Sequence, residues 1–160
     1  MHSKTPQRRA RHSIRSLTLP SVALPILAIL ATAMLTSCSS SGADPAALMG
    51  KTFTTQEATI GGVEQSLALG STLTLSFTSD GISARADCNT MFGSANLDGG
   101  KITMTTPLGM TMMACEQPLM DQDQWISDFL SSGPSWALDG SMLTLTSGED
   151  ILVLRSANTA

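Results

Sequence analysis

The chain has 160 residues and a formal net charge of −4, and its charges are unevenly distributed. Residues 1–37 carry five bases and no acids, whereas residues 38–160 carry four bases and all thirteen acids, a net charge of −9. An acidic segment of this kind repels the phosphate backbone, so the composition excludes nucleic acid as an expected partner.

The first 37 residues have the pattern of an export signal. A basic start is followed by an uncharged apolar run from Leu17 to Leu35. The run is almost long enough to span a bilayer, but Pro20, Pro25 and the residues after it favour cleavage. We therefore predict that residues 1–37 are a lipoprotein signal peptide.

The four residues at the end of this segment, Leu-Thr-Ser-Cys at positions 35–38, resemble a bacterial lipobox. The prediction is cleavage between Ser37 and Cys38 and lipidation of Cys38, with the protein on the extracytoplasmic side of the cell membrane. Acyl chains hold a protein at a membrane because each buried methylene contributes about 0.8 kcal/mol. The alternative is an ordinary secretory signal, or an uncleaved anchor, with an incidental cysteine.

Small and polar residues follow Cys38, so residues 38–49 are predicted to be a flexible tether. Residues 50–156 are long enough to form one domain with a core of its own. Residues 157–160 are predicted to be a disordered tail.

Alternation of apolar and polar residues predicts antiparallel strands through most of the domain. In chain order they are a first strand over residues 51–59, a hairpin over 71–88, a second hairpin over 93–105, and three strands over 135–156. Residues 116–133 instead have the pattern of a helix, with Pro118 in the first turn and Gly133 just past the end. The predicted fold class is α+β: a small antiparallel sheet of about eight strands with one helix inserted before the last three.

Few residues are available for catalysis. His2 and His12 both lie in the predicted signal peptide, which leaves no Ser–His–Asp or Cys–His arrangement and no histidine-bound zinc for the mature domain. The acids at predicted turns are Asp80, Asp98 and Asp139, and those on the predicted helix are Asp121, Asp123 and Asp128. We expect these acids to be solvated, so a carboxylate-based hydrolase is the weaker alternative to a protein with no enzymatic activity and no cofactor.

Two cysteines remain besides Cys38. Because an exported protein folds in an oxidising compartment, Cys88 and Cys115 are interpreted first as a structural disulfide. Free thiols, metal ligands and a redox pair are the alternatives.

Cys115 ends a sulfur-rich segment, Met-Thr-Met-Met-Ala-Cys at positions 110–115. Copper(I) prefers such soft ligands, so one interpretation is a copper(I)-handling protein of the cell envelope. The other is packing, because a domain with four Phe, two Trp and no Tyr needs side chains that fill irregular gaps. We favour packing, with Met113 in the core and no metal site, although this leaves Met110 and Met112 unexplained.

Three motifs, in this order, resemble the META-domain family, which includes the HslJ-like heat-shock lipoproteins of bacteria. Cys88, Asn89 and Gly93 match C-N-x-x-x-G, Thr111, Met113 and Cys115 match T-x-M-x-C, and Leu143 and Leu145 match a closing L-x-L strand. Two departures are Phe53, where many members have tryptophan, and Asp87, where glycine is common. The resemblance implies a curved sheet, a stress-related or envelope role, and no known enzymatic reaction.

The segment from Asn89 to Gly93 is a candidate binding loop. Ordinary backbone roles account for both residues as well, since Asn tolerates left-handed turns and Gly permits a bulge. The sequence as a whole predicts a lipid-anchored, non-catalytic envelope module that binds a protein or a small apolar ligand.

Overall fold

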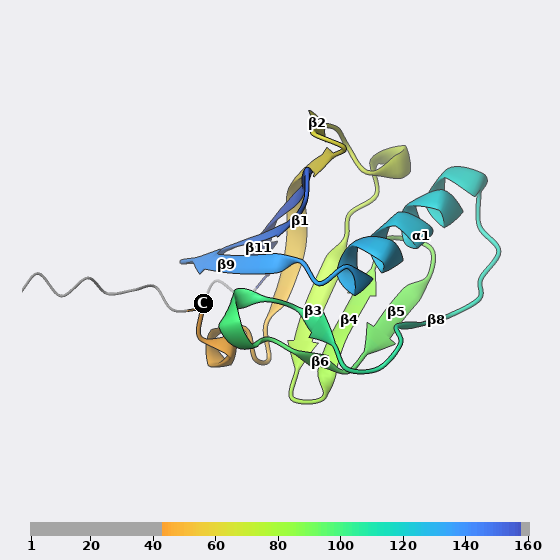
Figure 1. Cartoon of the computed structure of the whole chain (residues 1–160). Helices are drawn as coiled ribbons and strands as arrows, with labels where there is room; N and C mark the ends of the chain where they lie inside the picture. The colour runs from red at the N-terminus through yellow and green to blue at the C-terminus, as the bar shows by residue number, and fades with distance from the viewer. Residues whose placement is uncertain (1–42, 158–160) are drawn as a thin grey trace, which may run out of the picture. The chain divides into compact units, whose positions relative to one another are not determined.

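The computed structural model describes residues 43–157 (Figure 1). Cleavage and lipidation at Cys38 lie outside the described residues and stay predictions, and so do residues 158–160 of the disordered tail predicted over residues 157–160. Among residues 43–157, no helix is both long enough and apolar enough to cross a membrane.

The main sheet of the described residues is antiparallel, curved and open, and it has nine strands (Figure 1). Its order is β8-β5-β4-β3-β1-β11-β10-β9, with β2 paired to β1 outside this path. Its members are β1 (Thr52–Ile60), β2 (Val63–Glu64), β3 (Thr74–Thr78), β4 (Gly81–Arg85), β5 (Thr90–Gly93), β8 (Gly109–Met110), β9 (Ser135–Asp139), β10 (Met142–Ser147) and β11 (Asp150–Ser156). A separate two-stranded ribbon pairs β6 (Ala95–Asn96) with β7 (Thr103–Met104).

The longest strand pairing joins the two ends of the domain. β1 pairs with β11 from Phe53 opposite Ser156 to Thr59 opposite Ile151. On its other side, β1 pairs with β3 only over Thr52–Thr54. The two strands therefore diverge beyond Thr54, which bends the sheet away from a flat ribbon.

The α-helix of the described residues, α1 (Gln117–Ser131), packs against one face of the sheet near β4 and β5 (Figure 1). Pro118 stands in its first turn, and Gly133 follows its end with φ +76°, as the sequence pattern predicts. Ile126, Phe129 and Leu130 are its buried apolar residues. The predicted α+β fold, with one helix before the last three strands, is confirmed for this part of the chain.

Alternating strand residues supply most of the remaining core. In the first hairpin, the buried set is the one that alternation predicts: Leu73, Leu75, Phe77, Ile82, Ala84 and Ala86. β10 adds Leu143 and Leu145, and β11 adds Leu152 and Leu154. The closing L-x-L motif is thus a pair of core residues on one face of β10.

The predicted tether is too long at its C-terminal end. Asp44 caps a 3₁₀ helix, Pro45–Ala47, by accepting the backbone N–H of Ala46 at 3.0 Å. Leu48 follows and is fully buried in the core. The prediction was based on the small, polar composition of this segment. It overlooked that Asp44 is an N-cap and Pro45 the first helical residue, which together direct Leu48 inward.

Candidate functional site

Two polar side chains of α1 hold the connection between β4 and β5. Gln122 donates to the Ser71 hydroxyl at 2.8 Å and to the carbonyl oxygen of Ala86 at 3.4 Å. Asp123 Oδ2 accepts the backbone N–H of Asn89 at 3.0 Å and its Nδ2 at 2.9 Å. Gln122 and Asp123 are 8% and 1% exposed, so these bonds form away from water.

The burial of Asp123 corrects the expectation that the helix acids are solvated. Asp121 and Asp128 are indeed exposed, but Asp123 lies three and seven residues before Ile126 and Leu130. Those intervals place it on the same buried stripe of the helix. This spacing is visible in the sequence. The sequence does not show that Asn89 is the polar partner of Asp123, and this partner is what makes burial of the carboxylate tolerable.

Asn89 also fixes the segment that follows β8. Its Oδ1 accepts the Thr111 hydroxyl at 2.9 Å and the backbone N–H of Met113 at 2.8 Å. The Thr111 hydroxyl in turn accepts the N–H of Thr90 at 3.0 Å. Asn89 is 5% exposed, and its amide is occupied by contacts within the domain. It therefore positions residues 111–113 and is poorly placed to bind a ligand with its own polar atoms.

Cys88 and Cys115 lie on either side of the same network. Their sulfur atoms are 2.07 Å apart, the distance of a disulfide bond, and the two residues are separated by 27 positions in the sequence. This link, together with Asn89, ties the chain on both sides of Met113. A sulfur atom engaged in such a bond is not a thiolate ligand.

Three methionines near this network face solvent. Met112 is 99% exposed, Met113 is 60% exposed, and Met120, in the first turns of α1, is 42% exposed. The prediction that Met113 packs in the core is wrong, because Asn89 binds the backbone of Met113 and leaves its side chain outside. Met104 and Met110 are partly buried and do pack against the core.

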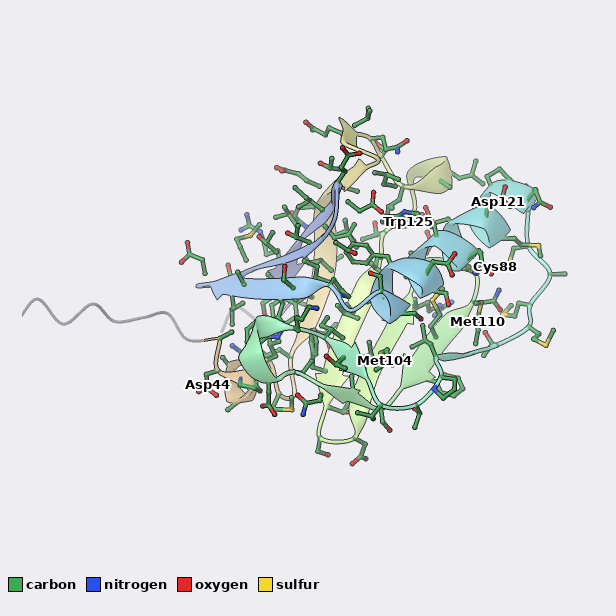
Figure 2. The ribbon with its side chains drawn as sticks, viewed as in Figure 1. Asp44, Cys88, Met104, Met110, Asp121 and Trp125 are labelled. Carbon is green, nitrogen blue, oxygen red and sulfur yellow. A yellow bond between two sulfur atoms is a disulfide. The ribbon has the colours of Figure 1, made fainter. Side chains whose placement is uncertain are left out.

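These side chains surround one hollow of about 520 Å³, which we call the methionine groove. Its lining residues are Asn89, Met110, Thr111, Met112, Met113, Ala114 and Met120. Figure 2 shows sulfur-bearing side chains along the loop that leads from Met110 to α1. The groove is mostly apolar, and it lies at the β8 edge of the sheet.

Gly93 does not share this site with Asn89. It ends β5 and lines a different hollow of about 460 Å³ beside Phe92, which is 53% exposed. A Cβ at Gly93 would come within 2.6 Å of Met104 Cε and 3.3 Å of Leu108 Cδ1, so both side chains would have to move to admit it. The candidate binding loop is therefore divided, and only its Asn89 end borders the methionine groove.

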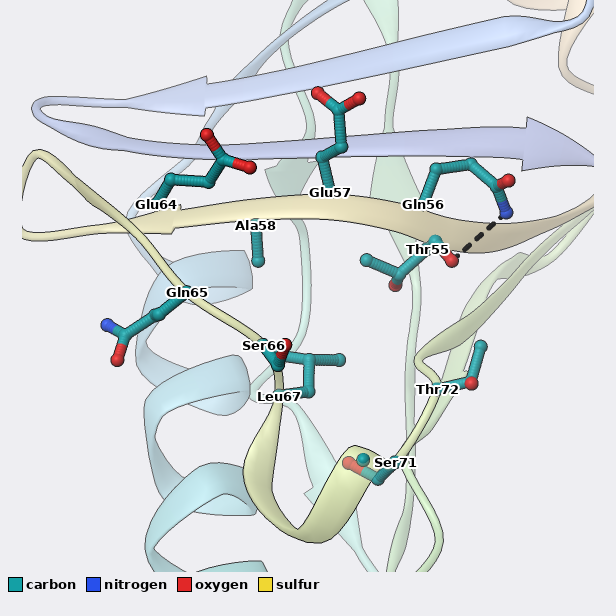
Figure 3. Close-up of a pocket in the computed structure, with 11 residues that line it drawn as sticks. Thr55, Gln56, Glu57, Ala58, Glu64, Gln65, Ser66, Leu67, Ser71 and Thr72 are labelled. Carbon is teal, nitrogen blue, oxygen red and sulfur yellow. Dashed lines mark hydrogen bonds between the residues drawn. The ribbon is translucent and has the colours of Figure 1, made fainter.

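A third hollow, of about 520 Å³, opens where β1 and β3 diverge (Figure 3). Ala58 and Leu67 lie on its inner side, while the carboxylates of Glu57 and Glu64 point to the opposite side of β1 (Figure 3). In residues 43–157, no three His, Cys, Asp or Glu side chains cluster as they do in a metal site. This hollow is lined mainly by polar side chains, among them Thr55, Gln65 and Ser71, and it has few of the apolar side chains that usually line a small-molecule site.

The order of these features along the chain matches a known family. The model of the META domain covers residues 46–159. The chain belongs to the META domain family.

Two structures solved by NMR share its fold. One, from Burkholderia xenovorans, is 20% identical to this chain and has a TM-score of 0.58. The match covers 92% of this chain and 100% of that chain. The other is 25% identical with a TM-score of 0.55 over 71% of this chain and 95% of that chain. Comparison with curated proteins finds no match.

Both departures from the META pattern fit the structure. Phe53 is fully buried, so it fills a core position as a tryptophan would. Asp87 has φ +66°, in the left-handed region that glycine enters most easily. A short polar side chain tolerates this region, so the turn before Asn89 keeps its shape.

Proposed function

We propose that this META-domain protein is a lipid-anchored, extracytoplasmic binding module without catalytic activity, and that its partner is an extended apolar peptide segment of another envelope protein. The observation that carries the proposal is the exposure of Met112, Met113 and Met120 around one apolar groove. Single exposed apolar side chains are common on proteins, whereas a cluster around a hollow is typical of an interaction site.

Methionine suits such a surface because its side chain is unbranched and flexible. It adapts to partners of different shape while still removing apolar area from water. Burial of a methionine side chain is worth about 1.5–3 kcal/mol. Covering two or three of them would give a short peptide a measurable affinity.

The backbone beside the groove has the character of an open strand edge. The N–H groups of Thr111 and Met113 point inward, to the carbonyl of Thr90 and the side chain of Asn89. The N–H groups of Met112 and Ala114, which alternate with them, donate no hydrogen bond to any residue in the described part of the chain. An extended peptide can pair with such an edge while its alternate side chains enter the groove.

The test uses a short fluorescent peptide of alternating leucine and threonine residues, with affinity measured by fluorescence polarisation. Met112→Gln/Met113→Gln keeps the side-chain length but removes the apolar surface, and we expect it to weaken binding at least about tenfold. Met112→Leu/Met113→Leu should bind within about threefold of the unmodified chain, because the surface stays apolar. Val63→Gln, at an exposed apolar residue outside the groove, is the matched control and should change nothing.

Methylation of alternate peptide nitrogens tests the strand pairing separately. The methylated peptide keeps its side chains but loses the donors that pair with the edge, so we expect it to bind more weakly. Equal affinity for the unmodified chain and the glutamine variant would contradict the proposal.

A further inference from the structure

We propose that the methionine groove also binds one copper(I) ion, through the thioether sulfurs of Met110, Met112, Met113 and Met120. The inference concerns the same groove as the proposed function but goes beyond it, since neither ligand requires the other.

The fold brings these four sulfur-bearing side chains to one hollow from three different elements. Met110 comes from β8, Met112 and Met113 from the segment after it, and Met120 from α1. Residues 111–116 have no regular secondary structure, so the side chains of Met112 and Met113 can turn toward Met110 and Met120 without breaking a strand or a helix.

The backbone of the segment is held at three points, which leaves the methionine side chains free to rotate. Asn89 holds Thr111 and the backbone of Met113, and Cys115 is joined to Cys88. The cost of gathering the ligands is therefore limited to side-chain rotation and a small loop movement. Preorganisation of this kind raises the affinity of a site without adding ligands.

The donor set selects copper(I) over other common ions. Thioethers are soft and neutral, a combination that suits copper(I), whereas copper(II) and zinc prefer nitrogen, oxygen or thiolate ligands. Residues 43–157 contain no histidine, and the sulfurs of Cys88 and Cys115 are bonded to each other. Only thioethers are left to act as soft ligands in this groove.

The charged residues nearest the groove along the chain favour a cation. Residues 109–121 include Glu116 and Asp121 and no Lys or Arg. Both acids are exposed and sit next to the groove residues in sequence. Their field would partly compensate the single positive charge that a neutral thioether set leaves in place.

Leucine substitution separates the metal from the apolar partner, because it keeps the shape and apolarity of the groove but removes sulfur. The full chain, purified in detergent with Cys88 and Cys115 oxidised, is titrated under argon with copper(I) supplied as its acetonitrile complex. Silver(I) serves as a second probe that does not change its oxidation state. Retained copper is measured after gel filtration, and the methionine methyl groups are followed by NMR.

We expect one equivalent of copper(I) to be retained, with shifted methyl signals for the exposed methionines of the groove. Met112→Leu/Met113→Leu should reduce the affinity at least about tenfold, whereas Met49→Leu, an exposed methionine outside the groove, should not change it. X-ray absorption of the bound copper should show sulfur ligands only.

Three results would overturn the inference: no copper retained, equal retention by the leucine variant, or retention only after the cysteines are reduced. The proposed function has a different pattern of failure. A leucine variant that loses copper(I) but keeps the peptide supports both statements. Copper(I) bound by a chain that shows no affinity for the peptide leaves the metal site standing and removes the peptide proposal alone.

Discussion

One carboxylate oxygen, Oδ2 of Asp123, accepts both the backbone N–H and the side-chain amide of Asn89, at 3.0 and 2.9 Å. The contact joins α1 to the start of β5, and both residues are more than nine-tenths buried. Asp123 Oδ1 has no hydrogen-bond partner among residues 43–157. The helix is therefore fixed to the sheet by a polar contact that depends on a single asparagine.

Asn89→Ala should lower the free energy of unfolding by at least about 2 kcal/mol. The substitution removes the amide partner of a buried carboxylate and the acceptor that holds Thr111 and Met113, and each such loss typically costs about 1–3 kcal/mol. Urea unfolding followed by circular dichroism measures the change. Asn96→Ala is the control, because Asn96 is exposed and bonds only to Asp98 in its own turn. Equal effects of the two substitutions would show that the buried network contributes no more to the free energy of unfolding than an exposed hydrogen bond does.

Removal of both cysteines, by Cys88→Ala/Cys115→Ala, should cost about 3–4 kcal/mol of stability, because the link closes a long loop in the unfolded chain. Intact mass under non-reducing conditions provides the direct measurement: the native chain should be lighter than the reduced chain by a pair of hydrogen atoms. If the mass shows two free thiols, and reductant leaves the unfolding midpoint unchanged, the structural disulfide is ruled out.

Gly81→Ala should be much more harmful than Gly61→Ala. Both glycines have positive φ angles, +147° and +59°, which L side chains rarely adopt, so alanine is strained at either position. A Cβ at Gly81 would also meet the carbonyl oxygen of Gly93 at 2.0 Å, whereas a Cβ at Gly61 has no atom within 4 Å. Thermal unfolding measures the midpoint of each variant. Gly61→Ala reports backbone strain alone, and Gly81→Ala reports backbone strain together with the steric clash. Similar midpoints would mean that β4 and β5 can separate here at little cost.

Cys38→Ala should release the protein from membranes, because the proposed lipid anchor is attached to that sulfur. Ser39→Ala, one residue further along, is the control and should stay membrane-bound. Cell fractionation with detection of the protein in each fraction gives the result. A Cys38→Ala variant that still sediments with membranes would refute lipidation at this site.

Alternation within the strands predicted the hairpins and their buried faces, because a sheet with one covered face imposes a period of two on its sequence. Helix punctuation at Pro118 and Gly133 predicted the position of α1 for an equally local reason. The features that the sequence did not predict depend on residues that are far away along the chain. Asp123 is buried because Asn89 meets it there. Met113 is exposed because Asn89 holds its backbone beside β8, which is the edge strand of the sheet that residues 43–157 form.

The place of β11 in the sheet has a consequence for how the domain is made. This strand, the last among residues 43–157, lies between β1 and β10, so it completes the middle of the sheet and not its border. Until it emerges, a growing polypeptide has two incomplete sheets with open edges. Folding of the sheet must therefore wait until β11 has been synthesised, and the pairing of residues about a hundred positions apart makes it slow compared with that of helical proteins. The proposed export through a membrane, which requires an unfolded chain, would gain from such a delay.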